Sequence, residues 1–222
     1  MLQSFSSKTL ESMMKHKLIT IVAFVIIVAA GTYIIVRQPK PNLAAVNKGE
    51  VITVSTDKPS EEEPVKVGYV WKGEASDPKK IVIPSIGVDG FIQKVGVDQN
   101  KQVGVPTNIY LTGWFVDSVK PGEKGLSIID GHLDGYQKDG VFKKLSQLKP
   151  GDEFTVEKGD GALLKYSVLT NKSVATEKAA AELFSQDPSV VSQLNLITCG
   201  GQFDESARSY KERVITTAEL IN

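Results

Sequence analysis

The sequence predicts an all-β domain, a closed or nearly closed barrel of about seven or eight strands with one or two short helices, preceded by a single transmembrane helix. Three observations lead to this architecture. An uncharged apolar run lies near the N-terminus, a polar stretch rich in Pro, Lys and Glu follows it, and the remainder alternates short β-branched runs with Gly, Pro, Asn and Asp. Closure is expected because it removes exposed strand edges.

The apolar run covers residues 18–36 and carries no charge. Its length suits a helix that crosses a hydrocarbon core of about 30 Å. A cleaved signal peptide is the alternative, since residues 28–30 (VAA) are small enough for a signal peptidase. The run continues through residues 34–36, which favours an anchor. The basic cluster at residues 15–17 favours a cytoplasmic tail at residues 1–17, with everything after the helix outside a cell membrane crossed once.

The polar stretch at residues 37–78 predicts an extracellular linker. The barrel domain is then expected over residues 79–222. One helix is predicted over residues 176–186, with Thr176 as its N-cap and a proline behind it, and residues 141–148 add a helical turn. The predicted strands are the β-branched runs at residues 81–86, 91–95, 126–129, 154–156, 163–169, 194–198 and 214–217.

Composition limits the possible partners. Lys and Arg together number 26, as do Asp and Glu, so the formal net charge is zero and no basic excess is available for nucleic acid. The acidic run at residues 61–63 is expected to be a solvated part of the linker. Cys199 is the single cysteine, so no internal disulfide forms and the thiol is paired with another chain, reactive or buried.

The chemistry of the domain is expected at two strand ends. His132 ends GLSIIDGH and Cys199 ends LNLITC, so the imidazole and the thiol share one rim if these strands are neighbours. A nearby cation favours the thiolate, and a guanidinium also holds a developing oxyanion. Arg213 opens the last predicted strand, whereas Arg208 lies in the loop before it. Rigid support favours Arg213, and Arg208 stays an alternative.

These segments resemble the sortases, which are membrane-anchored cysteine transpeptidases of bacterial cell surfaces. The resemblance covers most of residues 79–222, and the segments IVIPSIGVD, GWF, KPGEKG, GHLDG, GVFKKLSQLKPGD and LITCGGQFD are most similar to class F. It implies a sortase-type barrel in which His132 is the acid and base, Cys199 the nucleophile and Arg213 the transition-state stabiliser.

The resemblance also implies contacts with substrate. Thr198 matches a substrate-binding Thr of the family, and Ile197 and Gly200 are assigned to the same role. Gly200 suits it on physical grounds too, since a residue without Cβ lets a peptide approach the sulfur. The helix at residues 176–186 is expected to form part of the wall that recognises the peptide.

The implied reaction is attack of the cysteine on the Thr carbonyl of an LPxTG-like sorting signal, followed by transfer to an amine of a cell-wall precursor or a pilin lysine. No metal or organic cofactor is required. A zinc site built from His132, Asp134 and Cys199 has too few ligands of the usual kind. Two alternatives are a non-catalytic, membrane-tethered β-module with a buried cysteine and an L,D-transpeptidase, whose His and Arg would stand two residues before and after the cysteine.

Overall fold

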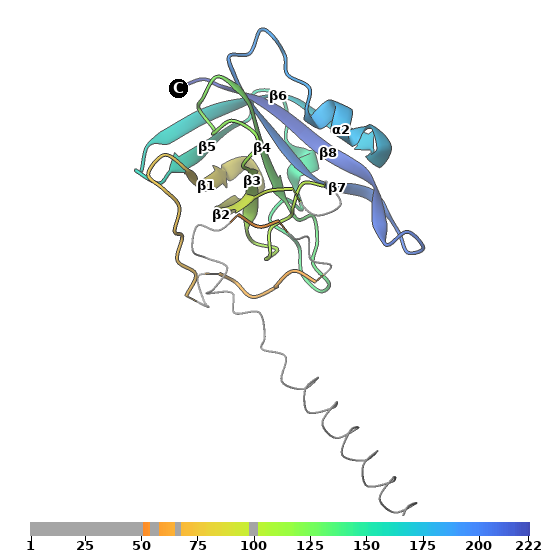
Figure 1. Ribbon diagram of the computed structural model, residues 1–222. Helices are drawn as coiled ribbons and strands as arrows, with labels where there is room; N and C mark the ends of the chain where they lie inside the picture. The colour runs from red at the N-terminus through yellow and green to blue at the C-terminus, as the bar shows by residue number, and fades with distance from the viewer. Residues whose placement is uncertain (1–50, 54–57, 65–67, 98–101) are drawn as a thin grey trace, which may run out of the picture. The chain divides into compact units, whose positions relative to one another are not determined.

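A computed structural model describes residues 51–53, 58–64, 68–97 and 102–222 (Figure 1). The chain divides into two compact units, residues 1–42 and 43–222, and all described residues belong to the second. The predicted cytoplasmic tail and transmembrane helix lie outside the described residues. Within the described ranges, no helix combines the length and the apolar character needed to cross a bilayer.

Eight strands close into the expected all-β barrel, in the order β1-β2-β3-β4-β7-β8-β6-β5. The pairs β2–β3 and β4–β7 are parallel and the other pairs are antiparallel. The strands are β1 (Pro78–Ile83), β2 (Val88–Val95), β3 (Thr112–Phe115), β4 (Gly125–Gly131), β5 (Glu153–Lys158), β6 (Leu163–Ala175), β7 (Ser192–Asp204) and β8 (Ser209–Leu220).

The sequence missed strand β3. It has four residues, all of them buried, and its second residue is Gly113. A strand buried on both faces shows no alternation of polar and apolar residues, and a glycine interrupts the β-branched run that would otherwise mark it. Pairing with β2 on one side and β4 on the other stabilises it instead.

The helix α2 (Thr176–Leu183) joins β6 to β7 and ends three residues before the predicted boundary. The prediction of Thr176 as N-cap was wrong, because the N-cap residue is Ala175 and no side chain caps the helix. The Thr176 hydroxyl instead donates a hydrogen bond to the Tyr210 carbonyl on β8 at 3.0 Å. The short 3₁₀ helices η1 (Pro84–Ile86) and η2 (Leu145–Gln147) complete the elements, and η2 lies where a helical turn was expected.

Two apolar clusters lie on the two faces of the sheet. The inner cluster draws residues from every strand, among them Ile129 of β4 and Leu196 of β7. The outer cluster includes Ile128 of β4 and packs against Ala179 and Leu183 of α2. Neighbouring residues of β4 thus face opposite sides, as expected for a strand. Each fully buried Ile or Leu contributes about 1.5–3 kcal/mol to stability.

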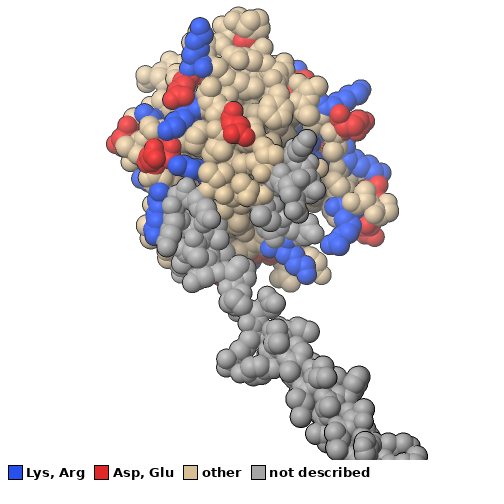
Figure 2. Space-filling model, viewed as in Figure 1, with Lys and Arg blue, Asp and Glu red and all other residues tan. Residues whose placement is uncertain are grey.

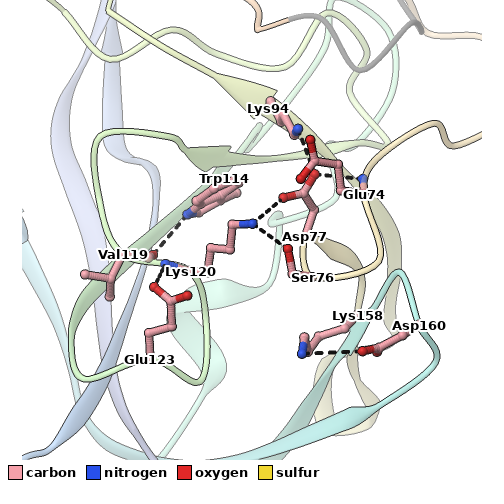
Figure 3. Close-up of polar contacts among 10 residues, drawn as sticks. All are labelled: Glu74, Ser76, Asp77, Lys94, Trp114, Val119, Lys120, Glu123, Lys158 and Asp160. Atoms are coloured by element: carbon pink, nitrogen blue, oxygen red, sulfur yellow. Dashed lines mark hydrogen bonds and ion pairs between the residues drawn. The ribbon is translucent and has the colours of Figure 1, made fainter.

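A buried carboxylate joins the segment before β1 to the barrel. The Asp77 side chain is 3% exposed, and its two oxygens accept from Lys94 Nζ at 2.7 Å and Lys120 Nζ at 3.0 Å (Figure 3). The backbone N–H of Glu74 donates to it as well, at 2.8 Å. Burial by itself would raise the pKa of Asp77, but these donors outweigh burial and the pKa is lowered. We call these four residues the Asp77 clamp.

Residues assigned to the linker also contact the barrel. Ile52 is buried and its backbone bridges Val95 of β2. Ser60 bridges Asn108 in the same manner. The Trp71 indole N–H donates to the Ile92 carbonyl at 3.1 Å. These contacts bring the chain before β1 alongside β2 and the loop that follows it.

The surface carries charges of both signs. Figure 2 shows Lys and Arg side chains interspersed with Asp and Glu on the face that it presents. Examples of surface ion pairs are Lys80–Asp89 and Lys165–Glu153, each with an N–O distance of 2.7 Å. Such exposed pairs contribute about 0–1 kcal/mol each, so the two apolar clusters are the main source of stability.

Candidate active site

The strand β4, which ends just before His132, pairs with β7, which carries Cys199, and this meets the condition on which the predicted site depended. In the parallel pair β4–β7, Asp130 stands opposite Ile197. His132 and Cys199 each follow two residues later and therefore lie at the same end of the sheet. In the antiparallel pair β7–β8, Cys199 stands directly opposite Arg213. The strands β4, β7 and β8 are adjacent (Figure 1). Their register brings the three predicted catalytic residues to one end of β4.

Thr198 of β7 contacts the end of β4. Its side chain is buried, and its hydroxyl donates a hydrogen bond to the Gly131 carbonyl, the residue before His132, at 2.7 Å. Because side chains alternate along a strand, Thr198 and Cys199 face opposite sides of β7. The structure therefore places Thr198 behind the rim, where it fixes the spacing of the two strands that carry the imidazole and the thiol.

The backbone bends immediately after the cysteine. The register between β7 and β8 shifts between Gly200 and Phe203, and Gly201 has a φ of 70°. That conformation favours glycine. A Cβ on Gly200 would lie 2.9 Å from Val214 Cγ2, so packing against β8 already requires a glycine there. Ile197, on the face of Cys199, packs against the outer cluster.

His132 is held by a backbone carbonyl. Its Nε2 lies 2.7 Å from the Pro106 oxygen, and since a carbonyl only accepts, Nε2 carries the hydrogen. Nδ1 is then the basic nitrogen. Burial lowers the pKa of His132, and the hydrogen bond to Pro106 opposes this shift only in part. The imidazole is therefore neutral at pH 7.

Cys199 is half-buried and unpaired. Burial raises the pKa of its thiol, the charge of Arg213 lowers it, and the carboxyls of Asp130 and Asp134 raise it further. The net shift is upward, so at neutral pH the resting site holds a thiol beside a neutral imidazole. The arginine expected to favour the thiolate does act in that direction, but burial outweighs it.

The two candidate arginines occupy different surroundings. Arg213 Nη1 lies 2.8 Å from the Glu212 carbonyl, 3.0 Å from the Tyr210 carbonyl and 3.1 Å from the Thr176 hydroxyl at the start of α2. Arg208 is exposed on the turn between β7 and β8, where it has a positive φ of 49°. Contacts with β8 and α2 hold the Arg213 side chain opposite the thiol, whereas the position of Arg208 is set by an exposed turn.

A cleft of about 1000 Å³ opens beside the thiol. His132, Cys199 and Arg208 line it, whereas Arg213 is not among the described residues that do so. Its opposite wall includes Glu61, in the segment assigned to the linker. The Glu61 carboxylate accepts from the backbone N–H groups of Tyr136 and of Gln137, the latter at 3.0 Å. Those partners lie too far away in the chain for any sequence pattern to reveal this contact.

Tyr210 and Asp134 form a second polar contact on the cleft wall. The Tyr210 hydroxyl donates to Asp134 Oδ2 at 2.9 Å, and Lys143 pairs with the other carboxylate oxygen. Burial, with the help of Asp134, raises the pKa of Tyr210 to about 12, so the phenol stays protonated. Among the described residues, no three His, Cys, Asp or Glu side chains come together as a metal site.

Comparison with known proteins identifies the barrel. The family model described as the sortase domain matches residues 81–221. The chain belongs to the sortase family. Sortases are cysteine transpeptidases, and the match spans His132, Cys199 and Arg213.

Solved sortase structures share this fold. Sortase A from Corynebacterium diphtheriae, as a lid mutant, superposes with a TM-score of 0.50 at 24% identity, over 68% of this chain and 73% of that one. The pilus-related sortase C of Group B Streptococcus has a TM-score of 0.50 at 18% identity, over 79% and 81% of the two chains. No curated protein sequence matches significantly.

Proposed function

We propose that this sortase is a membrane-anchored transpeptidase of the class F type, which cleaves an LPxTG-like sorting signal and joins the protein to an amine of the cell wall or of a pilin. The observation that carries the proposal is the position of Cys199, which lines a cleft with His132 and stands opposite Arg213. Residues 18–36 would anchor the chain, with the barrel outside the cell membrane.

The first step forms the thioacyl enzyme. Cys199 Sγ bonds to the Thr carbonyl carbon of the signal while the thiol proton passes to His132. The protonated imidazole then gives that proton to the leaving Gly amine as the peptide C–N bond breaks. Both groups start neutral, so the proton moves in the attack itself and no resting ion pair is needed.

Arg213 would stabilise the oxyanion of both tetrahedral intermediates. Its described hydrogen bonds all involve Nη1, which leaves the Nη2 and Nε donors for the oxyanion. In the second step an incoming amine attacks the thioacyl carbon, the new amide bond forms, and the C–S bond breaks to restore the thiol. Ile197, on the face of Cys199, and Gly200, next to it in the chain, would contact the peptide, while Thr198 would support the site from the opposite face of β7.

The alternatives are less consistent with this site. A non-catalytic β-module would bury an inert cysteine, whereas Cys199 lines a cleft together with an imidazole. An L,D-transpeptidase would belong to another family, and the match over residues 81–221 is to sortases.

The test is ligation by the full chain, purified in detergent, with an LPxTG peptide and triglycine as the amine. Intact-mass spectrometry is expected to show an acyl adduct on Cys199 and a ligated product. Cys199→Ala should form no adduct, and His132→Asn should lower the rate of acylation by a factor of about 10²–10⁴. A folded protein that forms no adduct across a panel of sorting peptides would contradict the proposal.

A further inference from the structure

Strand β4 carries a buried carboxyl that the proposed chemistry does not use. The Asp130 residue is 8% exposed, and its Oδ1 has no hydrogen-bond partner. The described part of the chain holds one other such atom, Ser127 Oγ, on the same strand. An unsatisfied buried polar group destabilises the folded state, and folded proteins pair most such groups. An orphan oxygen next to a reactive site therefore points to a partner that the folded chain itself does not supply.

The register places this oxygen on the face of the nucleophile. Asp130 follows Ile128 by two residues, and Ile128 belongs to the outer cluster, so Asp130 faces the same side. Across the parallel pair it stands opposite Ile197, also of the outer cluster. The next step along both strands is the row of His132 and Cys199. Two residues span about 7 Å of strand, so the orphan oxygen lies one row from the thiol.

The neighbouring strand leaves space for the carboxyl. Gly113 on β3 pairs with Asp130, and a Cβ on Gly113 would collide with Asp130 Oδ1 and come within 2.8 Å of Val95 Cγ1. The oxygen thus sits over a position without a side chain, beside an apolar group. On β2, Gln93 pairs with Gly113 and belongs to the same row. Its side-chain amide donates a hydrogen bond to the Thr107 hydroxyl and accepts one from the Thr107 backbone N–H. No donor of this row hydrogen-bonds Asp130 Oδ1.

Two apolar side chains of the outer cluster, Ile52 and Val103, can move without loss of a barrel strand. Ile52 and Val103 pack in the same outer cluster as Val95, and both belong to segments outside the eight strands. Isolated bridges join Ile52 to Val95 and Val103 to Val97. A peptide that displaces these two side chains would therefore reach the row of Asp130 while the sheet stays intact.

We propose that Asp130 is a specificity-determining residue of the acyl-donor groove, which hydrogen-bonds a carboxamide side chain, Asn or Gln, on the residue directly before the scissile Thr. The inference rests on the proposed function. Burial favours the neutral form of this carboxyl, and in that form it both donates and accepts a hydrogen bond, as a carboxamide does. In the bound peptide, the residue before the Thr would lie between the row of Cys199 and the row of Asp130, and its side chain would reach the row of Asp130.

The experiment measures acylation of the full-length protein in detergent by four LPxTG-type peptides that differ only at the variable residue, which is Gln, Met, Glu or Lys. For the wild type we expect kcat/KM to be about tenfold higher with Gln than with Met, the effect of one hydrogen bond. Glu has the size of Gln but carries a negative charge. The ratio of two peptides within one protein does not depend on its folded fraction.

The variants separate recognition from packing. Asp130→Ala should bring the ratio of Gln to Met close to one, with Met cleaved at least as well as before. Asp130→Asn should keep part of the preference, because an amide also donates and accepts. Ser127→Ala is the matched control, since Ser127 is the other orphan, lies on the opposite face from Asp130 and should leave the ratio unchanged.

A wild-type ratio near one, a ratio that Asp130→Ala leaves unchanged, or a preference for Lys would each overturn the inference while acylation itself still supported the proposed function. No adduct on Cys199 with any of the four peptides would overturn both. The adduct mass therefore tests the transpeptidase, and the ratio of rates tests Asp130.

Discussion

Two aspartates, Asp77 and Asp130, are buried among the described residues, and their surroundings are opposite. Asp77 accepts from two lysines and a backbone N–H, and its pKa is lowered in spite of burial. Asp130 has an oxygen without a partner, and burial raises its pKa well above the usual range. The first carboxylate has every partner it needs within the fold. Asp130 destabilises the fold, because no group of the described chain pairs with its buried Oδ1. It lies one row from the thiol, where a substrate can supply the missing partner.

The largest expected effect is the loss of the Asp77 clamp. Asp77→Asn should lower the free energy of unfolding by about 2 kcal/mol, less than for a fully buried pair because both lysines reach solvent. Thermal unfolding should show a midpoint about 4–8 °C lower. Asp89→Asn, which removes an exposed partner of Lys80, is the control and should change the midpoint little. An equal loss in both variants would contradict the clamp.

The second effect has the opposite sign. Asp130→Asn should raise the free energy of unfolding at pH 8 by about 1 kcal/mol, because an isosteric amide has no charge to desolvate. The unfolding midpoint should rise accordingly. Differential scanning calorimetry of the wild type and the variant measures it. A variant that is less stable than the wild type at every pH would mean that Asp130 has a partner within the fold.

The pH dependence of stability distinguishes the two carboxyls further. A lowered folded pKa means that the contribution of Asp77 is present above the unfolded value of about 3.9 and is lost as the pH falls through the folded pKa. A raised folded pKa means that Asp130 destabilises increasingly as the pH rises above about 3.9 toward its folded pKa. Unfolding of Asp77→Asn and Asp130→Asn between pH 2 and 8 should therefore show gaps to the wild type of opposite sign. The Asp130 gap should close as the pH falls to about 3.9, and the Asp77 gap should begin to close only below that value.

The smallest expected effect concerns the cation beside the thiol. Removal of the Arg213 charge by Arg213→Gln should shift the pH profile of Cys199 alkylation by iodoacetamide upward, because that charge opposes the raised pKa. Arg208→Gln is the matched control on the neighbouring turn. A larger shift with Arg208→Gln would reverse the assignment of the two arginines.

Much of the site could be read from chain position. His132 and Cys199 end β-branched runs, and Arg213 comes just before the last such run, so all three were expected at strand ends. This is confirmed for His132, which follows the end of β4 at Gly131. It was wrong for Cys199 and Arg213, because β7 continues to Asp204 and β8 begins at Ser209, so that both residues lie inside paired strands. Thr176 was misread because a Thr before an alanine-rich run matches the pattern of an N-cap, while its hydroxyl turned out to face β8. Glu61 gave no signal, since a carboxylate that binds backbone N–H groups leaves no pattern in the sequence.

By itself the sequence determined the class of fold, the approximate positions of seven of the eight strands, and the candidate thiol, imidazole and arginine, because hydrophobic periodicity and turn residues act locally. Only the tertiary structure decided which strands are neighbours, that Cys199 stands opposite Arg213, and that of two aspartates one is paired and the other is not. The reason is physical: burial and hydrogen bonding depend on residues distant in the chain, and these set the charge that each carboxyl and the thiol carries.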